Sequence, residues 1–264
     1  MMSSRVLPTL QHAWARGESM VGAAIKVPSP LCAESVALAG FDCVYVDQQH
    51  GVFDDAQLLQ VLQAIAAGGA VPLTRVPENH PWLIHKALDF GAAGIIVPLV
   101  ETEADAKQAA AACRYPPSGS RSYGLLRPSS AVAPYDRDSP ACMVLVESAR
   151  GVDNLDAIAQ TDGIDAIMAG PQDLALSMGI RLEGDWLRTP RLFEAILQIR
   201  KACARRGIAA AIGASSGADA LMWLEQGFQL VTVGNDLGYI RSSMQTQLRL
   251  ARAGANGSPT GPAS

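Results

Sequence analysis

The chain has 264 residues, 49% of them hydrophobic, and a formal net charge of −4. It contains no run of about 18 uncharged apolar residues, so we expect no membrane-spanning helix. No basic block is present, which argues against a nucleic-acid partner. The first 15 residues lack the apolar core of a signal peptide, which predicts a cytoplasmic protein.

Short apolar segments alternate with helical patterns along the whole chain. The predicted strands cover residues 21–27, 43–47, 71–75, 94–98, 143–147, 164–169, 208–212 and 230–233. The predicted helices cover residues 8–16, 29–40, 55–67, 81–90, 103–114, 151–160, 190–206 and 217–226. The second helix shows the boundary signals most clearly, with Ser29 as N-cap, Pro30 at its first position and Gly40 at its end.

Strands that alternate with helices pair in parallel through βαβ crossovers. A doubly wound sheet is the alternative, but neither of the usual glycine-rich phosphate motifs occurs. The length suits a (β/α)8 barrel of roughly 250 residues. We therefore predict an α/β protein with a single (β/α)8 TIM-barrel domain over residues 1–252, a long loop over 115–140, and a disordered Gly/Ser/Pro/Ala-rich tail over 253–264.

The five cysteines lie far apart without a Cys-x-x-Cys pair. We interpret them as small buried thiols rather than as zinc ligands or disulfides.

Charged side chains gather where the predicted strands end, and these ends build the active site of such a barrel. The residues are Lys26, Asp47, His50, Arg75, Glu147 and Asp173. Taken singly, these residues have structural explanations: Glu147 or Asp173 can cap a helix or lie on the surface, Arg75 can be an ion-pair partner, and His50 can be an ordinary loop histidine. Their occurrence together at one end of one barrel favours a functional site.

The residue types indicate which chemistry this site performs. Two carboxylates without a cysteine favour a hard divalent ion such as Mg2+ or Mn2+. Such an ion binds a 2-oxo acid and, as a Lewis acid on the keto group, stabilises an enolate. Arg75 supplies a fixed cation for the substrate oxygens, and His50 titrates near neutrality and is the natural proton shuttle.

Lys26 allows several interpretations. A lysine at a strand end can be a Schiff-base nucleophile, which would make the protein a metal-free aldolase. Glu147 and Asp173 would then have no role, so we favour a second anion-binding group or a lysine that extends to solvent.

These residues resemble the HpcH/HpaI family of metal-dependent class II pyruvate aldolases over residues 21–236. Segments in family order and at family-like spacing carry the resemblance. They are residues 29–34 (SPLCAE), 47–51 (DQQHG), 75–77 (RVP) with 87–91 (ALDFG), 114–121 (RYPPSGSR), and Glu147 with 170–174 (GPQDL).

The resemblance implies a role for each matching residue. Glu147 and Asp173 fall on the metal ligands, for which Mg2+, Mn2+ and Co2+ are all suitable ions. Arg75 falls on the arginine that contacts the keto acid and stabilises the enolate. His50 falls on the acid/base histidine and Asp89 on its aspartate partner. The backbone at Gln172 and Asp173 falls where the family holds the substrate carboxylate.

The family pattern also implies a homo-oligomer, a hexamer or trimer of dimers that exchanges a C-terminal helix between subunits. The chain departs from the pattern at several positions around the site. The family's Asp-Gly-Glu-His reads Asp-Gln-Gln-His at 47–50, a common glutamine is Leu145, and a common tryptophan is Ala24, with Lys26 on the same strand face. The loop at 125–140 is also shorter. These departures bear on the substrate rather than on the metal site.

Three hypotheses follow. The first is a class II aldolase that cleaves and forms 4-hydroxy-2-oxo acids through a metal-bound enolate of pyruvate or hydroxypyruvate and an aldehyde, with His50 and Asp89 moving the proton of the C4 hydroxyl. The second is a condensation of oxaloacetate with acetyl-CoA at the same metal site, like that of a siderophore-type citrate synthase. The third is a barrel that binds a partner without chemistry.

Overall fold

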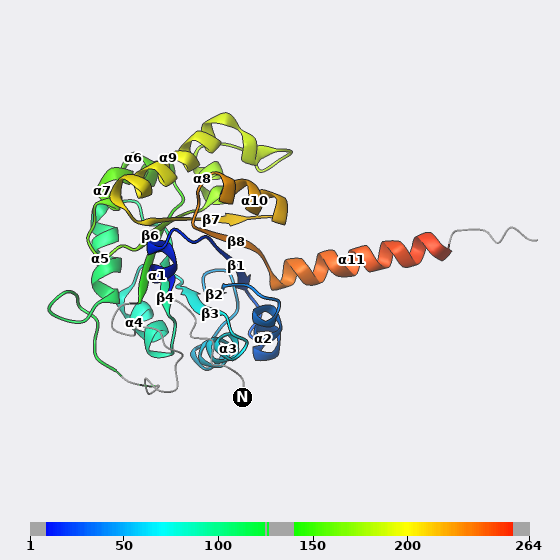
Figure 1. Ribbon diagram of the computed structural model, residues 1–264, viewed down its shortest axis with the longest axis horizontal. Coiled ribbons are helices and arrows are strands. Elements are labelled where there is room, and N and C mark those ends of the chain that lie inside the picture. The colour runs from blue at the N-terminus through cyan, green and yellow to red at the C-terminus, as the bar shows by residue number, and fades with distance from the viewer. Residues whose placement is uncertain (1–8, 125, 127–139, 256–264) are drawn as a thin grey trace, which may run out of the picture.

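The computed structural model describes residues 9–124, 126 and 140–255. Eight parallel strands form a closed barrel in which each strand pairs with the next and the last pairs with the first (Figure 1). The strands are β1 (Met20–Ile25), β2 (Cys43–Asp47), β3 (Val71–Arg75), β4 (Gly94–Val97), β5 (Ala141–Val146), β6 (Ala166–Ala169), β7 (Ala209–Ala214) and β8 (Leu230–Asn235). The predicted (β/α)8 barrel and all eight predicted strands are confirmed.

Helices surround the barrel. They are α1 (Leu10–Ala15), α2 (Pro30–Leu38), α3 (Asp55–Ala67), α4 (Pro81–Asp89), α5 (Glu103–Cys113), α6 (Ala149–Asp153), α7 (Leu155–Ala159), α8 (Pro171–Ser177), the 3₁₀ turn η2 (Trp186–Arg188), α9 (Pro190–Arg206), α10 (Gly217–Glu225) and α11 (Asp236–Ala255). Local signals set their ends. The Ser29 hydroxyl caps α2, Asp54 and Gln57 form a capping box on α3, and α9 stops at Gly207 with a φ of 76°.

The core has two layers. One fills the barrel interior with side chains such as Leu73, Ile96 and Met143, and Leu10 and Trp14 of α1 join it. The other lies between the outer face of the strands and the helices. Strands buried on both faces must be apolar nearly throughout, which explains why the alternation of strand and helix was readable from the sequence.

The single helix predicted over 151–160 was wrong: two short helices, α6 and α7, occupy this part of the chain. They meet at Asn154, whose backbone leaves the helical region with φ −96° and ψ 9°. Its side-chain amide donates to the Glu101 carbonyl at 2.8 Å. This bond connects the junction of the two helices to Glu101, in the segment before α5.

Three further features concern the ends and the surface of the chain. Helix α11 leaves the barrel and projects away from it (Figure 1). It extends to Ala255, so the predicted tail is helical over its first three residues, and 256–264 fall outside the described residues.

Residues 115–124 of the predicted loop form neither helix nor strand, while most of 125–140 is not described. In the part of the chain that the structure describes, no helix has the length and apolar character needed to cross a bilayer.

The five cysteines were interpreted from the sequence as small buried thiols. All five are free thiols; Cys43, Cys113, Cys142 and Cys203 are buried, and Cys32 is half-buried.

Candidate active site

A cavity of about 490 Å3 opens at the C-terminal ends of the strands. Lys26, His50, Arg75, Glu147 and Asp173 line it, as does Gln172. The structure therefore brings these predicted site residues together in one cavity; Asp47 does not line the cavity but is bonded to Arg75, and Asp89 lies outside it. The reason is geometric, because parallel strands of a closed barrel all present their C-terminal ends to the same rim.

Asp47 and Arg75 form the rigid part of this rim. They end neighbouring strands and lie directly opposite each other in the β2–β3 register. Arg75 Nε donates to Asp47 Oδ1 at 2.9 Å and Nη2 donates to Oδ2 at 2.7 Å, a two-bond fork that fixes the plane of the guanidinium. The His50 backbone N–H adds a third bond to Oδ1 at 3.2 Å.

The ion pair decides the charge state of Asp47, which is fully buried. Burial by itself would raise the pKa of this carboxyl, but the hydrogen bonds and charge of Arg75, the His50 N–H and the Lys26 ammonium lower it, and the net pKa lies below its ordinary value. Asp47 is therefore a permanent anion that holds Arg75 in place. Its position at a strand end had indicated a charged rim residue without a specific role.

Glu147 follows β5, two strands along the barrel from Arg75 at the end of β3, and is only 3% exposed. The Leu99 backbone N–H donates to Glu147 Oε1 at 2.9 Å. Leu99 adopts a left-handed φ of 54°, uncommon for a residue other than glycine. Gly170 permits a close approach on the other side, since a Cβ there would lie 2.6 Å from Glu147 Cβ and 2.7 Å from Oε2.

The second carboxylate of the site belongs to Asp173, in the first turn of α8. Burial raises the pKa of Glu147 to about 7, and the charge and hydrogen bonding of Asp173 add to the rise. The Leu99 N–H and the charge of Arg75 oppose it. Glu147 is buried and Asp173 is exposed to the cavity, and the two carboxylates repel each other when both are ionised, so the pair gains from a cation between them.

The donor set fits a hard divalent ion. Among the residues that the structure describes, no group of three or more His, Cys, Asp or Glu side chains is placed to hold a metal. Glu147 and Asp173 do supply two carboxylates to one cavity. Magnesium-type ions bind through one or two carboxylates and complete their shell with water and substrate oxygens. Such an ion at this pair would keep positions open for a bound acid.

Gln172 and Asp173 also place backbone donors at the cavity. The first helical bond of α8 runs from the Leu174 N–H to the Gly170 carbonyl at 3.0 Å. The N–H groups of Gln172 and Asp173 precede that bond and are orphan donors of the first turn.

His50 and Asp89 do not form the predicted pair within this chain. His50 is exposed at the cavity rim, whereas Asp89 ends α4 and does not line the cavity. No hydrogen bond joins the two side chains among the described residues. Asp89 instead accepts from Arg121 Nη2 at 2.9 Å, and the Arg121 guanidinium stacks on Tyr115 at 4.6 Å.

These features define a (β/α)8-barrel protein with an acid pair and a fixed arginine in its C-terminal cavity. Comparison with known proteins gives the narrower assignment. The HpcH/HpaI aldolase/citrate lyase family matches residues 25–243. A 5-keto-4-deoxy-D-glucarate aldolase of Escherichia coli (strain E24377A) is 36% identical over 251 residues, covering 92% of this chain and 97% of that protein.

Solved structures that resemble this chain include a protein of the same family. An HpcH/HpaI aldolase/citrate lyase family protein from Burkholderia cenocepacia J2315 is 32% identical, with a TM-score of 0.84, covering 92% of this chain and 98% of that one. The citrate synthase SbnG is 28% identical, also with a TM-score of 0.84, covering 94% and 99%. The chain belongs to the HpcH/HpaI aldolase/citrate lyase family, and its aldolase relatives support a carbon–carbon lyase.

The raised pKa of Glu147 leads to a prediction about stability. Its folded-state pKa of about 7 lies above its ordinary value of 4.5. Between these two pH values the Glu147 carboxyl is therefore protonated in the folded protein and ionised in the unfolded chain. The stability due to this proton is complete below about pH 4.5 and is lost as the pH rises through 7. The charged carboxylate then costs about 3 kcal/mol of unfolding free energy, at 1.36 kcal/mol per pKa unit.

Glu147→Gln should therefore stabilise the protein at pH 8 by roughly 1–3 kcal/mol and change it little at pH 5, since the amide still accepts from Leu99 and carries no charge. Urea unfolding in EDTA at both pH values measures this. Glu183→Gln, at an exposed surface glutamate, serves as the control. A variant less stable than the native protein at pH 8 would contradict the prediction that the buried, ionised Glu147 carboxylate destabilises the folded protein.

Proposed function

We propose that the protein is a class II aldolase that reversibly cleaves 4-hydroxy-2-oxo acids to pyruvate, or hydroxypyruvate, and an aldehyde. The observation that carries the proposal is the acid pair Glu147 and Asp173 facing the fixed Arg75 in one cavity. The aldolase relative named above supports the same reaction class.

Glu147 and Asp173 would hold a divalent ion, Mg2+, Mn2+ or Co2+, which when bound polarises the keto oxygen of the substrate as a Lewis acid. Arg75 binds the oxygens of the 2-oxo acid and stabilises the negative charge of the enolate, because the guanidinium donors not used by Asp47 keep a fixed direction. The backbone N–H groups of Gln172 and Asp173 hold the substrate carboxylate.

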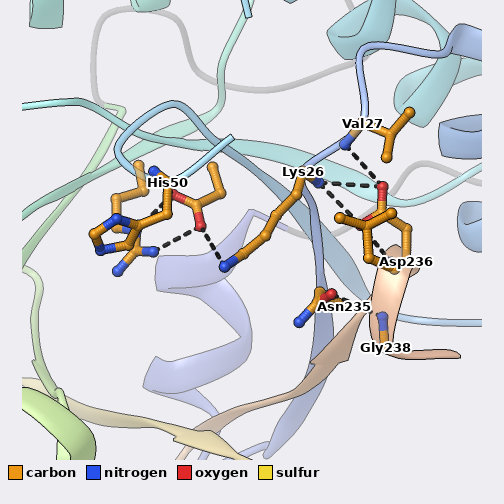
Figure 2. Close-up of polar contacts among 9 residues, drawn as sticks. Lys26, Val27, His50, Asn235, Asp236 and Gly238 are labelled. Atoms are coloured by element: carbon orange, nitrogen blue, oxygen red, sulfur yellow. Dashed lines mark hydrogen bonds and ion pairs between the residues drawn. The ribbon is translucent and has the colours of Figure 1, made fainter. Parts of the chain in front are cut away.

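His50 moves the proton to or from the C4 hydroxyl as the C3–C4 bond breaks or forms. Its backbone N–H donates to Asp47, which holds His50 at the rim of the cavity (Figure 2). Asp89 is proposed as its partner on the family resemblance alone, since within this chain its carboxylate is engaged with Arg121.

The test is a lactate-dehydrogenase-coupled assay for pyruvate release from 4-hydroxy-2-oxo acids, with Mg2+, Mn2+ or EDTA. We expect release that depends on the added ion. Activity that survives EDTA and disappears in Lys26→Ala would instead indicate a Schiff-base aldolase. If no 4-hydroxy-2-oxo acid reacts, the protein either catalyses a different reaction or binds a ligand without chemistry.

A second candidate function is the condensation of oxaloacetate with acetyl-CoA. The similarity to the citrate synthase SbnG favours it, as does the extra room and positive charge that Ala24 and Lys26 give the cavity. Thiol release from acetyl-CoA in the presence of oxaloacetate, without aldol cleavage, would establish this reaction in place of the first.

We also propose that the protein is a homo-oligomer, a hexamer or trimer of dimers, assembled through α11. One face of this helix carries Leu237, Ile240, Met244 and Leu248, which are 42–68% exposed. Such a repeating apolar face is typical of a helix that packs against another surface. Helix α2 also exposes apolar side chains, at Leu31 and Leu38.

For location, we propose the cytoplasm, a compartment that keeps cysteines as free thiols.

Placing charge on this face should dissociate the assembly. We expect Met244→Asp with Leu248→Asp to sediment as a smaller species than the native protein in analytical ultracentrifugation, because burying two unpaired carboxylates is strongly unfavourable. Thr246→Asp, on the opposite face of the helix, is the control. A native protein that sediments as a monomer would rule the assembly out.

A further inference from the structure

Lys26 is a cavity cation that the proposed reaction does not use. It follows β1, and its backbone is held by the carboxylate of Asp236 at the start of α11. The Lys26 N–H lies 3.1 Å from both Asp236 oxygens and the Val27 N–H lies 2.9 Å from Oδ2 (Figure 2). Asp236 is only 2% exposed. The point from which the Lys26 side chain enters the cavity is therefore fixed.

The Lys26 ammonium has capacity for another acceptor. Its nearest anion is Asp47, at 3.6 Å from Nζ to Oδ2, which is too long for a normal hydrogen bond. The Asp47 oxygens already accept bonds from Arg75 and His50. An ammonium has three donors, and the Lys26 side chain is 28% exposed. It is therefore available to an anion that enters the cavity.

The position of Lys26 in the barrel indicates which end of a substrate it meets. In the closed order of eight strands, β1 lies four strands from β5, so the Lys26 backbone enters the rim on the side opposite Glu147. Its ammonium reaches toward Asp47 at the end of β2. The lining that β1 shares with β7, β8 and α11 is otherwise neutral: Ala24, Gly213, Ser215, Thr232, Asn235 and Ser242. Ala24 lies on the same strand face as Lys26 and leaves room beside it.

We propose that Lys26 is a specificity-determining residue that binds a carboxylate at the far end of the substrate. With the 2-oxo acid at Glu147 and Asp173, a proposal that rests on the aldolase function above, an extended chain crosses the cavity toward β1. The preferred substrates are then 2-oxo diacids, and the aldehyde they release carries a carboxylate. The rival role for Lys26 is to shield Asp47 and so act on every substrate equally through Arg75.

The first experiment measures binding and needs no turnover. Isothermal titration calorimetry compares 2-oxoglutarate with 2-oxopentanoate, five-carbon 2-oxo acids that differ only in the terminal carboxylate, in the presence of Mg2+. We expect the native protein to prefer 2-oxoglutarate by about 10–100-fold, the range for a hydrogen bond between charged groups. Lys26→Met should remove most of this preference, and Lys26→Arg should retain it.

The control is Lys107→Met, at a lysine on the exposed face of α5, which should leave the preference as in the native protein. Equal weakening of both acids by Lys26→Met would show that Lys26 acts through Asp47 and Arg75 and would overturn the proposal. A preference that survives Lys26→Met would also overturn it.

The second experiment separates this proposal from the aldolase proposal. Addition of pyruvate to succinic semialdehyde and to butanal, both four-carbon aldehydes, is followed with the same variants. We expect the ratio of kcat/KM for the two aldehydes to fall about 10–100-fold in Lys26→Met. If neither aldehyde reacts and no 4-hydroxy-2-oxo acid releases pyruvate, the aldolase function fails, while a Lys26-dependent preference in the calorimetric comparison still supports the carboxylate site.

Discussion

Arg75→Lys is expected to lower kcat/KM for pyruvate release by about 100-fold or more, the usual cost of losing one fixed donor at a developing negative charge. Lysine keeps the positive charge but cannot form the two-bond contact with the Asp47 carboxylate. In the native protein Nε and Nη2 bind the two oxygens of Asp47 at 2.9 and 2.7 Å, which leaves the rest of the planar guanidinium directed into the cavity. An ammonium is a single point of charge on a flexible stem.

The coupled pyruvate assay, with saturating Mg2+, measures this effect, and thermal unfolding of the same sample checks that the barrel is intact. Arg181→Lys, at an exposed surface pair with Glu183, is the matched control and should behave as the native protein. Turnover of Arg75→Lys within about twofold of native would show that charge alone is sufficient, and would count against an oriented contact with the enolate.

Asp173→Ala should abolish ion-dependent turnover and weaken Mn2+ binding by at least about 100-fold, because loss of even an indirect partner of a metal ligand costs about 10–100-fold. Glu147 would remain as the only acid of the pair. Its pKa should fall toward its ordinary range, because the charge and hydrogen bonding of Asp173 help to raise it. Folding should change little, since an exposed acid in the first turn of a helix contributes only about 0.3–1 kcal/mol.

Mn2+ titration followed by electron paramagnetic resonance gives the affinity independently of activity. Asp162→Ala, which removes an exposed acid from a surface pair with Arg206, controls for the loss of a carboxylate as such. Unchanged Mn2+ affinity together with an unchanged rate in Asp173→Ala would refute the assignment of this residue as a ligand.

The rim of the barrel was largely predictable from the sequence. Lys26, His50, Arg75, Glu147 and Asp173 line one cavity, as their positions at strand ends had indicated. Helix α11 was implied only by the family resemblance and was not predicted from the residue pattern, although its apolar residues recur at 237, 240, 244 and 248, a helical spacing. Helix α8 is only seven residues long, and so short a segment shows no periodicity from which to predict it.

The contacts that hold the rim residues were not predictable. The fork between Asp47 and Arg75 depends on the register of two strands. The bond from Lys26 to Asp236 joins residues 210 positions apart, and that from Leu99 to Glu147 depends on an unusual backbone angle after β4. Asp89 shows the limit most clearly, because the family resemblance assigned it to His50 while the structure pairs it with Arg121.

The sequence by itself therefore determined the barrel, its strand order and the chemical groups at its mouth. Alternating strands and helices, in a chain of this length without a glycine-rich phosphate motif, favour a closed barrel that brings all strand ends to one rim. The tertiary structure decided which groups are fixed, which are charged and which are available. Those properties follow from burial and from contacts between distant segments. Two acids at strand ends thus differ in a way that the sequence did not show: Asp47 is a permanent anion bonded to Arg75, and Glu147 is a carboxyl with a pKa of about 7.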